Sequence, residues 1–179
     1  MEKKIAILRG INVGGRRKIL MEDLRELFAQ QGFESVRTYI QSGNILFETT
    51  SEDSNSTLER QLEAAITARF GFDVPVIIRT SKELQAAAQQ NPFYSEDADI
   101  SSLHLTFLND IPTKENYQKA LSKDYAPDAF SLKEKYVFVR CEGKYHKSKL
   151  SNAFFEKHFQ VNATTRNWKT VLKLVELSK

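Results

Sequence analysis

A glycine-rich loop followed by cations holds the residues whose types and spacing could do chemistry. Residues 9–18 follow an apolar run, contain three glycines and end in Arg16, Arg17 and Lys18. Glycine leaves backbone N–H groups uncovered, and such groups beside positive side chains bind anions. We therefore predict that this loop binds a phosphate or another anion. A flexible turn between solvated cations is the alternative interpretation.

The spacing of Gly10 and Gly15 matches the two glycines of a Walker A loop, but the rest of that motif is missing. A Walker A loop continues with lysine and then with serine or threonine, whose hydroxyl binds Mg²⁺. Here Arg16 can supply the positive charge, whereas Arg17 has no hydroxyl. The glycine spacing of a Rossmann dinucleotide site is also absent. We expect an anion-binding loop and not an ATP-hydrolysing one.

Three other segments carry side chains that suit the same kind of ligand. Residues 39–44 form a predicted hairpin turn dense in amides and hydroxyls, and turn chemistry alone does not require Gln41. Residues 144–149 combine three lysines with His146 and a tyrosine, a composition that suits phosphate or nucleic-acid contact. Arg166 stands beside a predicted helix start, whose exposed N–H groups favour anions. The plainer alternatives are a good turn, a solvated face and a helix capped by a threonine.

The expected ligand carries phosphate, as a nucleotide or as a nucleic-acid backbone, and would lie in a cleft between two domains. A small metal-independent transferase or hydrolase acting on a phosphorylated substrate, with His146 as its base, is one alternative. A structural or partner-binding module is the other. The predicted ligand-binding residues share a bare N–H group, a polar side chain or a positive charge, and they are Arg9, Gly10, Asn12, Gly14, Gly15, Arg16, Lys18, Gln41, Ser42, Asn44, Lys149, Arg166 and Asn167.

Metal and covalent chemistry find little support in the sequence. The three histidines, at positions 104, 146 and 158, lack the spacing of metal ligands, and one cysteine cannot build a zinc site. Cys141 falls on the inward face of a predicted strand, so we expect a structural thiol. Residues 6–18 contain no carboxylate, which argues against catalysis by paired carboxylic acids there. We expect no metal and no cofactor, and the sequence assigns no catalytic residue.

The composition is that of an ordinary soluble globular protein. Of the 179 residues 41% are hydrophobic and 27% are charged, and the net charge is +3. The single cysteine excludes an internal disulfide framework and fits a reducing compartment. The apolar run before Arg9 is too short for a secretory signal, and no run approaches the roughly 20 residues that span a bilayer. We expect a cytoplasmic protein without a membrane partner, of open oligomeric state.

The hydrophobic pattern of the first half predicts the order β-α-β-β-α-β. The expected strands are residues 5–8, 35–41, 44–49 and 74–79; one helix ends at Gly32, and a second lies between a capping box of Ser56 with Glu59 and Gly71. Ser42-Gly43 favours a two-residue hairpin turn, which would place Ile40 opposite Ile45. Leu20 would lie on the buried face of the first helix.

The second half repeats this order with its last strand replaced by a helix. A third helix starts near Ser81 and ends before Pro92, and the polar residues 94–102 are the best linker candidate. The elements expected after it are strands at 103–108, 129–132 and 136–141, with a turn at Glu134-Lys135, and helices at 113–122, 150–159 and 167–177. We therefore predict an α+β duplication, with domains at residues 1–92 and 93–179.

Three ordered blocks of the chain resemble an uncharacterised, mainly bacterial family, the domain-of-unknown-function 1697 family. The blocks are residues 7–15, residues 39–44, and residues 148–150 together with 163–168 and 170–171. The resemblance implies two ferredoxin-like domains with antiparallel sheets and implies no activity. The family usually carries glycine where Gln160 stands and asparagine where Lys169 stands. The first change argues against a left-handed helix end at Gln160, unless Asn162 takes that role.

Overall fold

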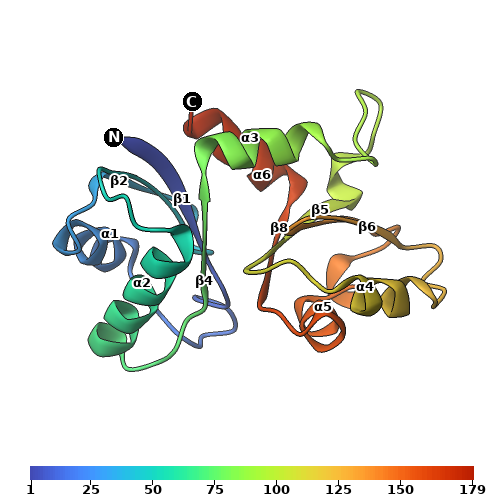
Figure 1. The fold of residues 1–179 in the computed structure, drawn as a ribbon, viewed down its shortest axis with the longest axis horizontal. Coiled ribbons are helices and arrows are strands. Elements are labelled where there is room, and N and C mark those ends of the chain that lie inside the picture. The colour runs from blue at the N-terminus through green and yellow to red at the C-terminus, as the bar shows by residue number, and fades with distance from the viewer. The chain divides into compact units, whose positions relative to one another are not determined.

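Two four-stranded antiparallel sheets with six α-helices make up the computed structural model, which describes residues 1–179 (Figure 1). The chain forms two compact units, of which the first contains residues 1–85 and 174–179 and the second contains residues 86–173. The mixed α+β fold and its duplicated order of elements agree with the expectation from the sequence. The domain boundary at residue 92 stays a prediction, because compactness alone does not show which segments fold by themselves.

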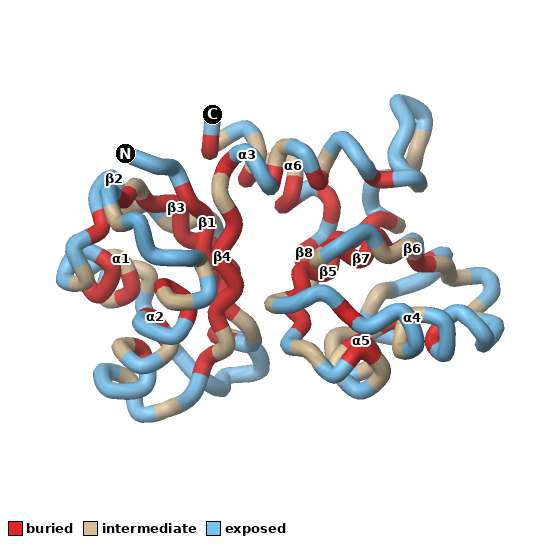
Figure 2. The backbone as a smooth tube through the Cα atoms, viewed as in Figure 1, coloured by how far each residue is buried: buried red, intermediate tan, exposed pale blue.

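Strands in the order β2-β3-β1-β4 form the sheet of the first unit. Its elements are β1 (Glu2–Leu8), α1 (Met21–Gln30), β2 (Glu34–Tyr39), β3 (Asn44–Thr49), α2 (Asn55–Phe70), β4 (Val76–Thr80) and the start of α3 (Ser81–Gln89). The apolar run of the sequence becomes the central strand β1, which is buried along most of its length (Figure 2). Ala6 and Ile45 of the sheet share one apolar core with Leu24, Phe28 and Leu62 of the two helices.

Carboxylates of α2 close the outer edge of β4. Glu63 Oε1 accepts from the N–H of Val76 at 2.9 Å, and Glu59 Oε1 accepts from the N–H of Ile78 at 2.7 Å. An edge strand otherwise presents unpaired N–H groups, and burying such a group without a partner costs free energy. The helix therefore both covers the sheet and satisfies its edge.

Two predictions for helix starts are wrong. Glu59 turns toward the sheet and forms no capping box with Ser56; Ser54 caps α2 instead, by accepting from the N–H of Thr57 at 3.2 Å. The apolar Leu20 precedes α1 as its N-cap residue, and the residue is 71% exposed. Helical spacing alone places Leu20 in the core, but the helix begins one residue later.

The hairpin between β2 and β3 has a longer loop than predicted. Residues 40–43 separate the strands, and Tyr39 pairs with Asn44. Ile40, predicted to lie opposite Ile45, sits in the loop at φ 51° and is exposed. The register is displaced by two residues, so the strand residues keep their predicted faces because side chains alternate with a period of two.

Strands in the order β6-β7-β5-β8 form the sheet of the second unit. Its elements are the end of α3, the 3-10 turn η1 (Ile100–Ser102), β5 (Leu103–Leu108), α4 (Lys114–Leu121), β6 (Ala129–Lys133), β7 (Tyr136–Arg140), the 3-10 turn η2 (Tyr145–Lys147), α5 (Asn152–Phe159), β8 (Ala163–Asn167) and the start of α6 (Trp168–Leu177). Lys133 pairs with Tyr136, which confirms the turn at Glu134-Lys135.

The second half contains the strand that the sequence pattern left out. Residues 163–167 form β8, which pairs antiparallel with β5 and brings Thr106 opposite Thr165. The order is therefore β-α-β-β-α-β followed by α6, as in the first half. A five-residue strand with four polar members gives too little hydrophobic signal to be recognised, and its partner strand supplies most of its stability.

Helix α5 ends in a left-handed residue despite the absence of glycine. Gln160 takes φ 56°, and its N–H donates to the carbonyl of Glu156 at 2.9 Å. Gln160 itself, and not Asn162, therefore provides the left-handed residue that ends the helix, although it is not glycine. The core beside this helix is rich in aromatic residues, with Phe130, Phe155 and Phe159 in edge-to-face or stacked pairs.

Candidate functional site

The connection from β1 to α1 is longer than this fold requires. Twelve residues separate β1 from α1, whereas five separate β5 from α4. Both connections leave the sheet in the same way, since Leu8 N donates to Gly43 O at 2.8 Å and Leu108 N donates to Lys135 O at 2.9 Å. The second unit thus shows the length that suffices. The additional residues of the first unit are surplus to the fold, and surplus loop length is where binding residues often lie.

The predicted anion loop contains a small hairpin. Val13 bridges Arg16, whose N–H donates to the carbonyl of Val13 at 3.0 Å. The two central residues, Gly14 and Gly15, take φ 58° and 73°. A two-residue hairpin turn of this kind needs positive φ at both positions, which glycine adopts without strain. The glycine pair therefore has a turn function, and it also leaves the tip of the loop without side chains.

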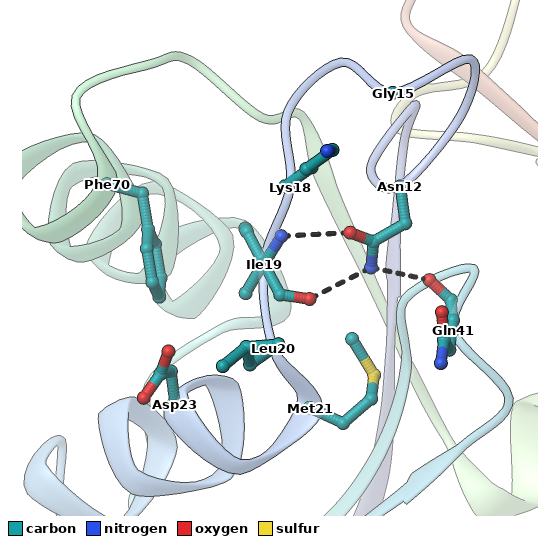
Figure 3. Close-up of a pocket in the computed structure, with 9 residues that line it drawn as sticks. All are labelled: Asn12, Gly15, Lys18, Ile19, Leu20, Met21, Asp23, Gln41 and Phe70. Atoms are coloured by element: carbon teal, nitrogen blue, oxygen red, sulfur yellow. Dashed lines mark hydrogen bonds between the residues drawn. The ribbon is translucent and has the colours of Figure 1, made fainter.

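Asn12 fastens the loop to the neighbouring hairpin. Its side-chain Nδ2 donates to the carbonyls of Ile19 and Gln41 at 3.0 and 2.9 Å, and its Oδ1 accepts from the N–H of Ile19 at 2.9 Å (Figure 3). Asn12 itself has φ 55°, a conformation that asparagine tolerates better than most residues. Both amide protons and the amide oxygen are used, so Asn12 builds the site and does not offer its amide N–H groups to a ligand.

A pocket of about 440 Å³ lies beside this loop (Figure 3). Its walls come from the loop, the first turn of α1, the end of α2 and the hairpin loop after β2. The lining residues are Asn12, Gly15, Lys18, Ile19, Leu20, Met21, Asp23, Gln41 and Phe70. Four of them, Asn12, Gly15, Lys18 and Gln41, are among the residues predicted from the sequence. The volume is in the range that holds a small organic ligand.

Positive charge dominates the loop side of the pocket. Arg16, Arg17 and Lys18 are exposed, and the Arg17 guanidinium lies over Gly10, 3.5 Å from the point where a Cβ would stand. The carboxylate in the pocket, that of Asp23, lies 3.7 Å from Arg69. Arg69 also pairs with Glu26 at 2.6 Å, so it offsets only part of the acidic charge, and the exposed cations of the loop are what favour a negatively charged group at Lys18.

The hairpin loop after β2 is held tightly. A Cβ on Gly43 would stand 2.7 Å from Leu8 Cβ and 3.0 Å from Ile11 Cδ1, and Gly43 has φ 84°. Asn44 is fully buried, and its Nδ2 donates to Tyr39 O and Ser42 Oγ, each at 3.0 Å. The Asn44 side chain therefore stabilises the loop, while Gln41 lines the pocket and is exposed.

The remaining predicted residues lie in different surroundings. Arg9 is half-buried, and its N–H donates to the carbonyl of Pro75 at 3.0 Å. In the second unit Lys149 is exposed, and Arg166 is buried on β8, where desolvation lowers the pKa of its guanidinium to about 10. Asn167 Oδ1 accepts from the N–H of Thr170 at 2.8 Å. Asn167, and not a threonine, thus caps α6, and the part of these residues in ligand binding stays a prediction.

Sequence reasoning missed the apolar wall of the pocket. Helical spacing places Phe70 on the core face of α2, whereas it is half-buried at the end of that helix, with the Arg69 guanidinium 5.7 Å from its ring centre. The same spacing places Leu20 in the core of α1. An apolar residue placed just outside a helix, next to a cationic loop, is the signal that could have indicated Leu20. No sequence signal brings Phe70 to the loop.

Other chemistries are not indicated by the geometry. The structure contains no group of three or more His, Cys, Asp or Glu side chains that could hold a metal ion. No helix has both the length and the apolar character that crossing a membrane requires. Cys141 is buried, and burial raises the pKa of its thiol, so it lies inside the core as predicted.

Comparison with known proteins gives a family and a fold. No curated protein matches the chain. One similar solved structure is that of a conserved bacterial protein, SP0830, from Streptococcus pneumoniae, at 26% sequence identity and a TM-score of 0.73, with 99% of each chain covered. The family model described as "Protein of unknown function (DUF1697)" matches residues 1–138. The chain therefore belongs to the DUF1697 family, as the three sequence blocks indicated.

Proposed function

We propose that the chain binds a nucleotide or a similar phosphate-bearing small molecule in the pocket of the first unit. The observation that carries the proposal is the combination of Lys18 and Gln41 with an apolar wall in one pocket of about 440 Å³. A phosphate alone would need only the cations. The wall formed by Leu20, Met21 and Phe70 suits a planar, less polar group attached to the phosphate, because aromatic and aliphatic side chains pack against bases.

The geometry assigns a part to each side of the pocket. Lys18 would neutralise the phosphate, with Arg16 adding to the positive potential around it. Gln41, whose carbonyl is fixed by Asn12, would present its side-chain amide to the polar edge of the ligand. Asp23, paired with Arg69, would accept from a base N–H group. No step of bond formation or cleavage is assigned, because no general base lines the pocket in a suitable pairing.

The proposal extends to the fold and the location of the protein. The strand orders β2-β3-β1-β4 and β6-β7-β5-β8, with two helices between the strands of each unit, support a pair of ferredoxin-like domains. A single buried cysteine supports a reducing, cytoplasmic location. The similar structure from a bacterium supports a bacterial source.

Calorimetric titration tests the binding proposal on the full chain. The ligands are the four nucleoside monophosphates, the matching nucleosides and inorganic phosphate. We expect at least one nucleoside monophosphate to bind more tightly than its nucleoside or phosphate alone. Lys18→Ala should weaken that binding about tenfold, the cost of losing one charge-assisted contact. The matched control is Lys123→Ala, which removes an exposed lysine of the second unit.

A second variant separates the two halves of the ligand. Phe70→Ala should weaken the nucleotide and the nucleoside by a similar factor and leave inorganic phosphate unchanged. Equal losses for Lys18→Ala and Lys123→Ala would show that binding reflects overall charge. That result, or no binding of any of these ligands, would overturn the proposal.

A further inference from the structure

Positive charge in this chain is concentrated in two places. The whole chain has a net charge of +3 with histidine neutral. Residues 9–18 contain four cations and no carboxylate, and residues 140–149 contain four cations and one carboxylate. The rest of the chain is therefore net negative. The first cluster belongs to the pocket described above, whereas the second, in the other unit, has no part in that proposal.

The basic segment, residues 144–149, is held by polar anchors at its C-terminal end. Ser148 Oγ donates to Asp128 Oδ2 at 2.6 Å, and Leu150 N donates to Ser148 Oγ at 3.1 Å. Asp128 also accepts from the N–H of Glu142 at 3.0 Å. The Asp128 carboxylate is thus turned inward to fix the backbone. The lysines on either side of Ser148 remain exposed.

An aromatic stack anchors the middle of the same segment. The ring of Tyr145 lies on the ring of His104, with centroids 4.4 Å apart and planes 22° apart. His104 belongs to β5 and is buried, so this ring contact holds Tyr145 against the sheet. Lys147 N donates to Lys144 O at 2.9 Å and closes the 3-10 turn η2. The tyrosine ring of the segment is therefore used for structure, while the His146 side chain is exposed.

We propose that the basic segment binds the phosphate backbone of single-stranded nucleic acid without reading its bases. Lys144, Lys147 and Lys149 are exposed on a backbone that is already ordered, so little backbone conformational freedom is lost when they contact phosphates. The hydrogen bond from Lys147 N to Lys144 O, at 2.9 Å, holds the backbone positions of these two lysines close together. Tyr145 is stacked on His104 and is not offered to a base.

A linear polyanion fits this surface better than a small anion does. The pockets of about 440 and 630 Å³ both lie in the first unit, and neither is lined by residues of the basic segment. Small ligands need such concave sites, whereas a row of exposed cations gains most from a chain of phosphates that releases its counterions. A single strand can also adjust its phosphate positions to cations held in place.

Fluorescence anisotropy with labelled twelve-nucleotide strands of uridine, adenosine or thymidine tests the proposal on the full chain. Contact with three phosphates predicts that the logarithm of the affinity falls with the logarithm of salt concentration with a slope of about −2. The triple variant K144A/K147A/K149A should lose at least tenfold in affinity at low salt, and its slope should shrink by about 2. The control triple variant K114A/K133A/K157A removes the same charge from positions elsewhere in the second unit.

A positioning variant tests whether the anchored backbone contributes. Ser148→Ala removes the anchor to Asp128 and keeps every cation, so the affinity should fall severalfold while the salt slope stays the same. Unchanged affinity of Ser148→Ala would contradict the role of the anchor. Equal weakening by the two triple variants, a strong preference among the three strands, or no binding by the wild-type chain would overturn the proposal. Circular dichroism melts check that each variant is folded.

Discussion

The two units share the same strand order and differ in the connection that follows their first strand. Both sheets place the second hairpin strand next to the first strand of the unit, and both first strands donate the same backbone bond at their ends. After that bond the first unit inserts a glycine-rich hairpin fastened by Asn12, and the second unit goes directly into its helix, capped by Thr113. The second unit thus serves as an internal reference for what the fold needs, and the first unit's surplus marks its pocket.

In both units two helices cover one face of a four-stranded sheet, but the side chains that fill the two cores differ. Helix α2 has 16 residues, whereas α4 and α5 have eight each. Shorter helices cover less of a sheet with aliphatic side chains. The second unit accordingly uses larger ones, with Tyr117, Tyr125 and Phe154 around Phe130. Aromatic rings supply more buried area for each helical residue, which compensates for the shorter length.

Replacing Gly43 should lower stability most, because it disturbs the hydrogen bond from Leu8 N to Gly43 O. The second unit has the same kind of bond, from Leu108 N to Lys135 O. Gly43→Ala forces a side chain to within 2.7 Å of Leu8 Cβ at a φ of 84°. Backbone strain and overpacking together should lower the free energy of unfolding by about 4 kcal/mol. Urea denaturation measures this loss.

The matched control for Gly43 is Gly14, which also has positive φ but has no atom within 4 Å of the point where a Cβ would stand. Gly14→Ala should cost about 1 kcal/mol, the strain term without the clash. Similar losses for the two variants would show that the close approach of the hairpin to β1 is not what fixes the turn.

Removing the Asn12 side chain should rank second. Asn12→Ala loses three hydrogen bonds and places alanine at φ 55°, for an expected cost of about 3 kcal/mol. The residue that follows the corresponding strand of the second unit, Asn109, accepts one bond from Asn162 N at 2.8 Å, so Asn109→Ala should cost about 1 kcal/mol. Hydrogen exchange of the Ile19 amide reports the loop directly. If that amide keeps its protection in Asn12→Ala, Asn12 does not fasten the loop.

The sequence predicted most of the fold because periodicity and turn chemistry act locally. The turn at Glu134-Lys135 and the inward faces of β6 and β7 follow from alternation alone. The first hairpin escaped the same reasoning, since Gly43 is required by its contact with Leu8 as well as by its positive φ, and that contact is not visible in the sequence. Strand β8 escaped it too, because its partner β5 and not its own composition makes it a strand.

The candidate site could be predicted only on its polar side. Glycines and cations are visible in the sequence, so Gly15, Lys18 and Gln41 could be identified without knowledge of the pocket. Phe70 lies far along the chain, and only the packing of α2 against the sheet brings it to the loop. Asn12 and Asn44 were predicted as ligand contacts, but their amides serve the loops, because an ordered loop must satisfy its own backbone groups first.

Removing the carboxylates that accept from the edge strands tests whether the two units close their sheet edges in the same way. These changes should lower the free energy of unfolding less than the Gly43 and Asn12 variants do. Glu63 accepts from Val76 N at 2.9 Å in the first unit, and Glu156 accepts from Ala163 N at 3.1 Å in the second. Glu63→Ala and Glu156→Ala should each lower the free energy of unfolding by about 1.5 kcal/mol, and the glutamine variants by less because an acceptor remains. Urea denaturation of the four variants measures both effects. A loss in one unit only would show that the two edges are closed by different means.

The smallest expected effect is a pH dependence of stability that is confined to the second unit, since all three histidines lie there. Burial lowers the pKa of His104 from the ordinary value of 6.5, and the hydrogen bond involving the Ser102 backbone offsets only part of that shift. The unfolded chain therefore binds the proton more readily than the folded one. His104 therefore leaves stability unchanged above pH 6.5, and stability falls progressively below that value, because the unfolded chain gains the proton while the folded chain resists it. Hydrogen exchange between about pH 7.5 and 5.5, corrected for intrinsic rates, should show protection falling in β5 and β7 and holding in β1 and β3. His104→Gln should abolish that difference, and an equal fall in both units would assign the pH dependence to groups other than His104.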